Sequence, residues 1–183
     1  MNRQESLEEV HNEIRHCTKC HLHKTRMHAV PGEGPVDARV MFVGEAPGRR
    51  EDATGRPFVG RSGELLTTLL ENIGLSREEV FITSVLKSRP PSNRTPQKEE
   101  IEACLPYLHR QLAIIQPEVT VLLGGVATNS LIGPWKLSDA HGSFYEAEGA
   151  TYFITYHPAA ALRFPKIQSR LEDDFRILEH ELG

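Results

Sequence analysis

Short apolar runs typical of buried strands alternate along this chain with segments of helical periodicity, and this alternation constrains the fold more than any other feature. The expected strands cover residues 38–43, 80–86, 119–123, 142–146 and 151–155. The expected helices cover residues 5–16, 62–73, 98–115, the stretch from the glycines at 124–125 to 131, and 168–181. Strands that alternate with helices predict a mostly parallel sheet covered on both faces. We therefore expect an α/β protein, built as a three-layer α/β/α sandwich with a central, mostly parallel sheet.

The size and composition of the chain set the limits of its organisation. Its 183 residues, 39% hydrophobic and 25% charged, are ordinary for one globular domain, so a single domain over residues 1–183 is expected. No apolar run approaches the length that spans a bilayer, and the amino terminus is polar and acidic, unlike a secretory signal. Three cysteines argue against a disulfide framework. We expect a cytoplasmic protein without membrane association.

The net charge of −4 excludes a uniformly cationic nucleic-acid binder. The basic residues are nevertheless bunched in three stretches, which hold Arg49, Arg50, Arg56 and Arg61, then Lys87, Arg89 and Arg94, then Arg163, Lys166 and Arg170. A local basic face can bind phosphates despite the overall balance. From charge alone, an ordinary solvated surface explains the same pattern equally well.

In a parallel sheet, sites form in the loops at the carboxyl ends of the strands. The first such loop, residues 44–63, is rich in glycine and contains the carboxylates Glu45 and Glu51, which could bind or activate water. Phe58 in the same loop could stack on a planar ligand, although packing onto the core is the commoner role. Ser62 could cap the following helix. This loop is the first candidate for a ligand site.

Two later loops add polar groups at the same edge. Residues 83–96 contain paired prolines with several donors, and they could equally form a rigid surface turn. His157 follows an expected strand directly and is fixed by Pro158. A lone histidine is often structural, but its position at the carboxyl end of a strand makes His157 a candidate functional residue.

Cys17 and Cys20 form a CxxC pair, and the third cysteine, Cys104, follows much later in the sequence. A CxxC pair serves zinc, iron–sulfur and redox sites alike. Zinc would accept the three cysteines with a histidine, and His16, His21 and His23 are close in sequence. An iron–sulfur cluster ordinarily requires four cysteines. Three buried or free thiols without a metal are the remaining interpretation.

Several motifs in fixed order resemble the family-4 uracil-DNA glycosylases. They are VPGEG at 30–34, GEAPGRREDATGRPFVGRSG at 44–63, the VLKSRPPSNR loop, LLGGVA at 122–127 and YHPAAALRFP. The resemblance runs from about residue 17 to 176, and the second motif is long and specific. It implies a single α/β/α domain that excises uracil from DNA and leaves an abasic site. It also implies a structural [4Fe–4S] cluster.

The resemblance assigns residues to the uracil base and to catalysis. They are Gly44, Glu45, Ala46, Pro47, Gly48, Glu51, Phe58, Ser84, Asn93 and His157. Within this set the family pattern implies that Glu45 holds the attacking water, Phe58 stacks on the flipped base and His157 contacts a carbonyl oxygen of the base. The DNA-binding residues are expected to be Arg61, Lys87, Arg89 and Arg163, the last in a loop that presses on the minor groove.

Two positions depart from the family pattern. Ser84 stands where an asparagine commonly reads the Watson–Crick edge of uracil, so base selection could be wider or uracil binding weaker. Ser88 stands where the third cluster cysteine is expected, which gives Cys17, Cys20, Ser88 and Cys104 as the ligand set. The serine oxygen could bind the fourth iron, water or another side chain could complete the cluster, or the site could hold zinc or no metal. Because three cysteines remain, a retained cluster is favoured.

The resulting hypothesis is a monofunctional DNA repair glycosylase that flips uracil out of DNA and excises it by hydrolysing the N-glycosidic bond. Its partner is uracil-containing DNA, single- or double-stranded, and it is expected to act as a monomer. One alternative keeps the fold but changes the substrate to another deaminated base such as hypoxanthine or xanthine. Another is a non-catalytic or trapping DNA-binding homologue, against which the joint survival of Glu45, Phe58 and His157 speaks.

Overall fold

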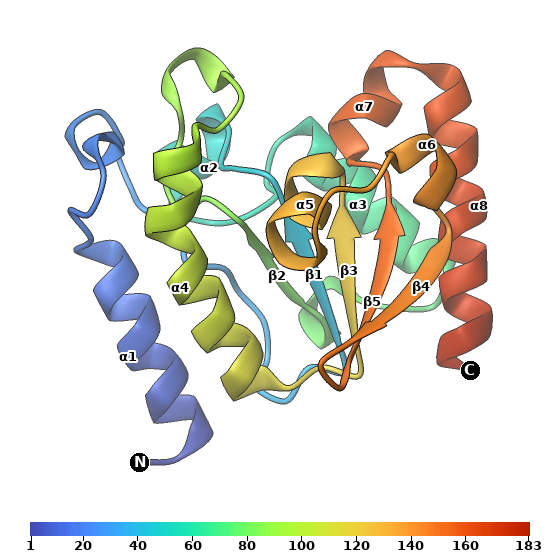
Figure 1. Ribbon diagram of the computed structural model, residues 1–183, viewed down its shortest axis with the longest axis horizontal. Coiled ribbons are helices and arrows are strands. Elements are labelled where there is room, and N and C mark those ends of the chain that lie inside the picture. Colours follow the sequence, from blue (N-terminus) through green and yellow to red (C-terminus); the bar gives the residue numbers. More distant parts are fainter.

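The centre of the computed structural model, which describes residues 1–183, is a five-stranded sheet in the order β2-β1-β3-β5-β4 (Figure 1). The strands are β1 (Val40–Gly44), β2 (Phe81–Ser84), β3 (Val119–Leu123), β4 (Ser143–Ala147) and β5 (Ala150–Thr155). The first four neighbours in this order are parallel, and only the edge strand β4 runs antiparallel, paired with β5. The predicted α/β class with a mostly parallel sheet is therefore confirmed.

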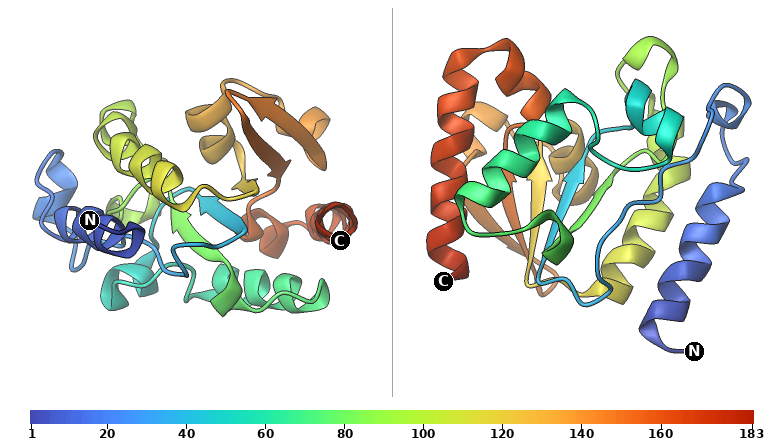
Figure 2. Two further views of the ribbon diagram at one scale, coloured as in Figure 1. Left: turned by 90° about the horizontal axis from the view of Figure 1, so that it is seen from below. Right: turned by 180° about the vertical axis from the view of Figure 1, so that it is seen from behind.

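Helices cover both faces of the sheet, as the view from below in Figure 2 makes plain. Helices α3 (Arg61–Asn72) and α8 (Pro165–Leu182) pack on one face, and α4 (Lys98–Ile115), α5 (Gly125–Ile132) and α6 (Leu137–Ala140) pack on the other. Alternate residues of β1 supply the two cores: Val40 and Phe42 face α3 and α8, while Met41 and Val43 face α4. Because both faces are buried, the central strands are continuous apolar runs.

Helix α1 (Arg3–Arg15) lies outside the three layers and packs against α4. Asn2 and Glu5 form a capping box at its amino end, and Leu7 joins the core beneath α4. Val10 and Ile14 form a smaller cluster with Ala29 and Tyr107. This arrangement places the cysteine pair that follows α1 beside the start of α4.

The long elements occur where the sequence predicts them, and the differences are local. Three short helices were not predicted: α2 (Arg49–Thr54), α6 and α7 (Pro158–Arg163). The chain also has three 3-10 turns, η1 (His21–Lys24), η2 (Arg77–Glu79) and η3 (Pro91–Asn93). Helix α8 starts at Pro165, earlier than expected, because proline is well suited to the first turn of a helix. None of the helices is long and apolar enough to cross a membrane.

Candidate active site

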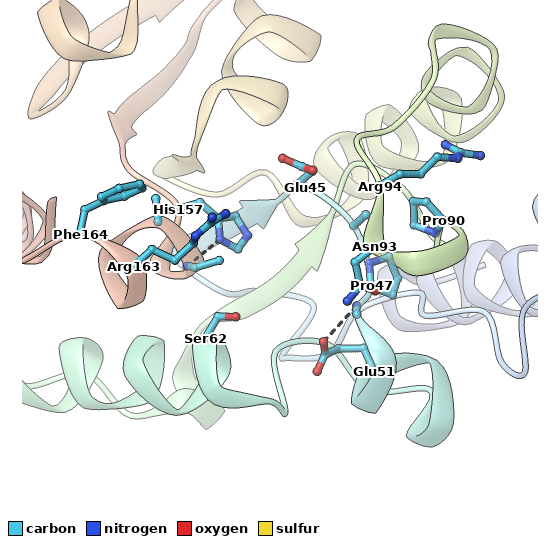
Figure 3. A pocket seen from close by; sticks show the side chains of 14 residues that line it. Glu45, Pro47, Glu51, Ser62, Pro90, Asn93, Arg94, His157, Arg163 and Phe164 are labelled. Carbon is cyan, nitrogen blue, oxygen red and sulfur yellow. Dashed lines mark hydrogen bonds between the residues drawn. The ribbon is translucent and has the colours of Figure 1, made fainter.

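A cavity of about 400 Å³ opens at the carboxyl ends of the parallel strands. Its volume falls within the range of about 300–1,000 Å³ that is usual for small-molecule sites. Its walls come from the loop after β1 with the start of α2, from His157 and helix α7 after β5, from the start of α3 and from the loop around η3 (Figure 3). The lining residues are Glu45, Ala46, Pro47, Gly48, Glu51, Ser62, Pro90, Asn93, Arg94, His157, Ala159, Ala160, Arg163 and Phe164.

A narrow recess of about 30 Å³ continues the cavity towards the core. The two spaces share Ala46, Pro47, Glu51, Ser62 and His157, and the recess adds Val30, Pro57, Phe58 and Ser84. The recess therefore brings together Phe58, the ring predicted to stack on the base, and Ser84, which departs from the family pattern. Val30 and Ser62 were not predicted as wall residues; only the VPGEG and glycine-rich motifs that contain them gave a signal.

Glu45 directly follows β1 and is half-buried at the cavity wall. Its backbone carbonyl accepts a hydrogen bond from the Leu86 N–H at 3.0 Å, which ties the loop to the chain leaving β2. Its carboxylate has no hydrogen bond or ion pair within the protein. Burial raises the pKa of this carboxyl above its ordinary value. The group is thus held at the cavity with its oxygens free for a ligand or a water molecule.

His157 stands between β5 and α7 as the N-cap of that helix. Its Nδ1 accepts a hydrogen bond from the Ala159 N–H at 3.0 Å, so in the neutral ring the proton resides on Nε2. Burial lowers the pKa of His157 to about 4, and the imidazole is therefore neutral at physiological pH. The residue presents an N–H donor rather than a positive charge.

The Phe58 ring stacks on the His157 ring, with centroids 5.6 Å apart and an interplanar angle of 26°. Phe58 has a left-handed backbone, with φ 48°, and Arg77 holds it by donating to the Phe58 carbonyl at 2.7 Å and to that of Pro57. Arg77 is in turn paired with Glu33. Phe58 both belongs to the core and borders the recess, so the two roles weighed from sequence are combined.

Glu51 lines the cavity, but its carboxylate is engaged by the main chain. Its oxygens accept from the N–H groups of Gly48 at 3.1 Å, Val59 at 3.1 Å and Gly60 at 2.9 Å. These bonds tie the turn before α2 to the turn before α3. The arrangement makes Glu51 a residue that fixes the shape of the loop.

The other residues predicted at the base and on DNA are gathered near the same opening. Ala46, Gly48 and Asn93 line the cavity, and Ser84 lines the recess. Gly44 lies behind it, because a β-carbon at Gly44 would come within 2.5 Å of the Phe58 ring. Of the predicted DNA-binding residues, Arg163 lines the cavity, Arg61 is exposed at the start of α3, and Arg89 donates to the Asn93 side chain at 2.8 Å.

The prediction that Lys87 binds DNA is wrong. Its side chain is only 2% exposed and its Nζ donates three hydrogen bonds inside the protein. Burial lowers the pKa of Lys87 to about 7. The sequence places Lys87 in a polar, proline-rich loop, but the chain turns its side chain inward beneath β2.

The three cysteines meet where the loop after β2 touches α4. Burial raises the pKa of Cys104 to about 11, and the neighbouring Cys20 and Cys17 add to the rise. The Lys87 N–H donates to the Cys104 sulfur at 3.4 Å. Ser88 is buried in the same loop, and its hydroxyl accepts a hydrogen bond from Arg26 at 3.1 Å.

This donor set bears on which metal it could hold. No three His, Cys, Asp or Glu side chains are grouped closely enough for a single metal ion. A cubane cluster spreads its thiolates over four irons, so it needs a wider set of sulfur ligands than one ion does. Three thiols from two segments, with a backbone N–H directed at one sulfur, are ligands of the kind that an iron–sulfur cluster takes.

Comparison with known proteins agrees with this geometry. A family model described as the Uracil DNA glycosylase superfamily matches residues 31–178, a range that contains the whole cavity. The fold and the cavity are therefore those of a uracil-DNA glycosylase superfamily domain.

Individual relatives narrow this class. A type-4 uracil-DNA glycosylase of Pyrobaculum aerophilum is 48% identical over 177 residues, which cover 92% of this chain and 90% of the relative. One of Archaeoglobus fulgidus is 48% identical over 181 residues, or 94% of this chain and 91% of the relative. A type-5 uracil-DNA glycosylase of Pyrobaculum aerophilum is 34% identical over 148 residues, or 71% and 65%. The chain belongs to the type-4 uracil-DNA glycosylases.

Proposed function

We propose that this protein removes uracil from DNA by hydrolysing the N-glycosidic bond, which leaves an abasic site. The observation that carries the proposal is that a free carboxylate, a neutral histidine with an Nε2–H donor and an aromatic ring meet at one cavity. These are the groups needed to hold a water, stabilise a departing base and receive its ring. The choice of uracil is supported by the names of the type-4 relatives and by the large share of the chain over which they match.

Base capture comes first, because a nucleotide within a duplex is out of reach of any side chain. The flipped base enters the cavity where it joins the recess and stacks on Phe58. Stacking contributes about 1–3 kcal/mol per base and offsets part of the unstacking cost. The left-handed backbone of Phe58, held by Arg77, keeps the ring in place before the base arrives.

Bond cleavage builds positive charge on the sugar and negative charge on the leaving base. The His157 Nε2–H donates to the base oxygen on which the negative charge gathers, as a donor of an oxyanion hole does. The ionised Glu45 carboxylate holds the attacking water and favours the cationic sugar. Since the pKa of His157 is lowered, the histidine acts by hydrogen bonding and needs no proton of its own to give up.

We propose that Cys17, Cys20 and Cys104 hold a [4Fe–4S] cluster with a structural role, which pins the segment after α1 to α4. The fourth ligand position falls at Ser88, whose oxygen keeps a lone pair beside the bond from Arg26. The cluster stabilises the fold, and no step of base excision involves it. The protein is further proposed to act as a monomer on DNA in the cytoplasm.

A broader base range is the second candidate function, and Ser84 favours it. The hydroxyl lines the recess and can act as donor or acceptor, whereas an amide presents one fixed pair. Such a wall discriminates less sharply between uracil and other deaminated bases. Hypoxanthine and xanthine are the alternatives to test.

Single-turnover excision on matched oligonucleotides tests both proposals. Each oligonucleotide carries uracil, hypoxanthine, xanthine or cytosine at one position, in single- and double-stranded form. We expect rapid cleavage at uracil and none at cytosine. Cleavage of hypoxanthine or xanthine at a similar rate would establish the broader range. Binding without cleavage of any of them would contradict both proposals and indicate a trapping homologue.

A further inference from the structure

Lys87 is a buried lysine with no carboxylate beside it, and base excision gives it no role. A buried charge is costly unless its hydrogen-bonding capacity is fully used. The buried carboxylate of Glu100 is engaged elsewhere, by Arg94 and His21. The hydrogen-bond partners of the Lys87 side chain explain how it is accommodated in the interior.

The Lys87 Nζ has three partners: Thr83 Oγ1 at 2.6 Å, the Ser84 carbonyl at 2.8 Å and Gln111 Oε1 at 2.8 Å. All three can only accept here. Thr83 already donates its hydroxyl hydrogen to the Pro31 carbonyl at 2.8 Å, and the other two partners are carbonyl oxygens. Three acceptors match the three hydrogens of an ammonium group.

The same network also holds a second segment of the recess wall, the one that contains Val30. The Pro31 carbonyl accepts from Thr83 and, at 2.8 Å, from the Gln111 amide. The Val30 N–H donates to the Lys87 carbonyl at 2.7 Å, and Val30 lines the recess. Through its side chain and its main chain, Lys87 therefore connects Ser84 and Val30, which both face the base.

We propose that Lys87 is a positioning residue of the base pocket, which sets the separation between the Ser84 wall and the Val30 wall of the recess. The inference rests on the proposed excision of uracil. It assigns Lys87 a role in base recognition without contact with DNA, since no part of the side chain reaches the cavity. Recognition by Ser84 depends on where its main chain is held, and the ammonium holds it.

The test replaces Lys87 by methionine, which keeps much of the length and removes the donors. We expect inhibition of the holoprotein by free uracil to weaken at least tenfold. The concentration of uracil-containing DNA that gives the half-maximal excision rate should rise in parallel. Affinity for the same duplex with an abasic site should change less than twofold, because that ligand leaves the recess empty. Lys98→Met, on the exposed start of α4, is the matched control and should equal wild type.

A purely structural role would weaken uracil and abasic-site binding together, and that outcome would overturn the proposal. If Lys87→Met does not fold, Thr83→Val decides, because it removes one acceptor of the ammonium and the bond to Pro31. It should weaken uracil inhibition at least threefold, and Thr83→Ser should restore it. Unchanged uracil inhibition in a folded Lys87→Met or Thr83→Val variant would contradict the proposed role of Lys87 but not the proposed excision of uracil. Wild-type protein that neither excises nor binds uracil contradicts the proposed function as well.

Discussion

At the scale of single residues, Glu45 is half-buried and its carboxylate has no hydrogen-bond or ion-pair partner in the protein. Its ionisation should therefore determine how the excision rate depends on pH. The raised pKa of Glu45 means that the carboxylate is lost at a higher pH than for an ordinary glutamate. Because the ionised form holds the water, we expect the single-turnover rate to fall as the pH is lowered through that raised pKa. His157, with a pKa of about 4, adds no transition near neutrality.

Glu45→Gln should abolish this acidic limb and lower the rate by about 10²–10⁴-fold, the usual contribution of a positioned acid or base. Rates measured from pH 4.5 to 8.5 on a uracil oligonucleotide check the expectation. Glu71→Gln, an exposed change near the end of α3, is the matched control and should retain both the rate and the limb. A Glu45→Gln profile that keeps the wild-type limb would assign the titration to another group.

At the scale of elements, the position of α3 depends on one glycine. A β-carbon at Gly63 would overlap the carbonyl group of Phe58, which is main chain and cannot turn aside. Gly63→Ala should therefore shift Phe58 or the first turn of α3, lowering the free energy of unfolding by about 1–3 kcal/mol and weakening uracil binding. Urea unfolding and uracil inhibition measure the two effects. Gly125→Ala, in α5 with no atom near the new carbon, should change stability by about 1 kcal/mol or less. Equal stability of the two variants would contradict this packing.

The same elements indicate what sequence reasoning could and could not reach. Helix α4 and strand β3 were predicted to their ends because long periodic or continuous apolar patterns report burial directly. Helix α7 has only six residues, too few to show helical periodicity in the sequence, although His157 is its N-cap. The inward turn of Lys87 was not predicted, because it depends on Gln111 in α4, 24 residues away, as well as on the nearby Thr83 and Ser84. Long-range polar pairing of this kind is decided only when the elements pack.

At the scale of the whole molecule, an acidic protein must bind an acidic polymer, so the distribution of charge matters more than its sum of −4. Arg163 lines the cavity and Arg61 is exposed at the start of α3, and neither forms an ion pair with a protein carboxylate. Arg39, at the opposite end of the sheet, is paired with Glu118 at 2.8 Å. Arg94, which also lines the cavity, is neutralised by Glu100, so Arg163 is the unpaired cation of the cavity wall, whereas the paired Arg39 stands away from it.

This asymmetry predicts how binding responds to salt. Each phosphate contact on duplex DNA contributes about 0.9 to the slope of log affinity against log salt, because it releases counterions. Arg163→Gln should therefore lower that slope by about 1 and weaken binding at low salt, whether or not the DNA contains uracil. Arg39→Gln should leave the slope unchanged. Fluorescence anisotropy on a labelled duplex over a range of salt concentrations measures both variants. Equal slopes for Arg163→Gln and wild type would move the phosphate path off this side of the cavity, and a reduced slope for Arg39→Gln would place it at the opposite end of the sheet.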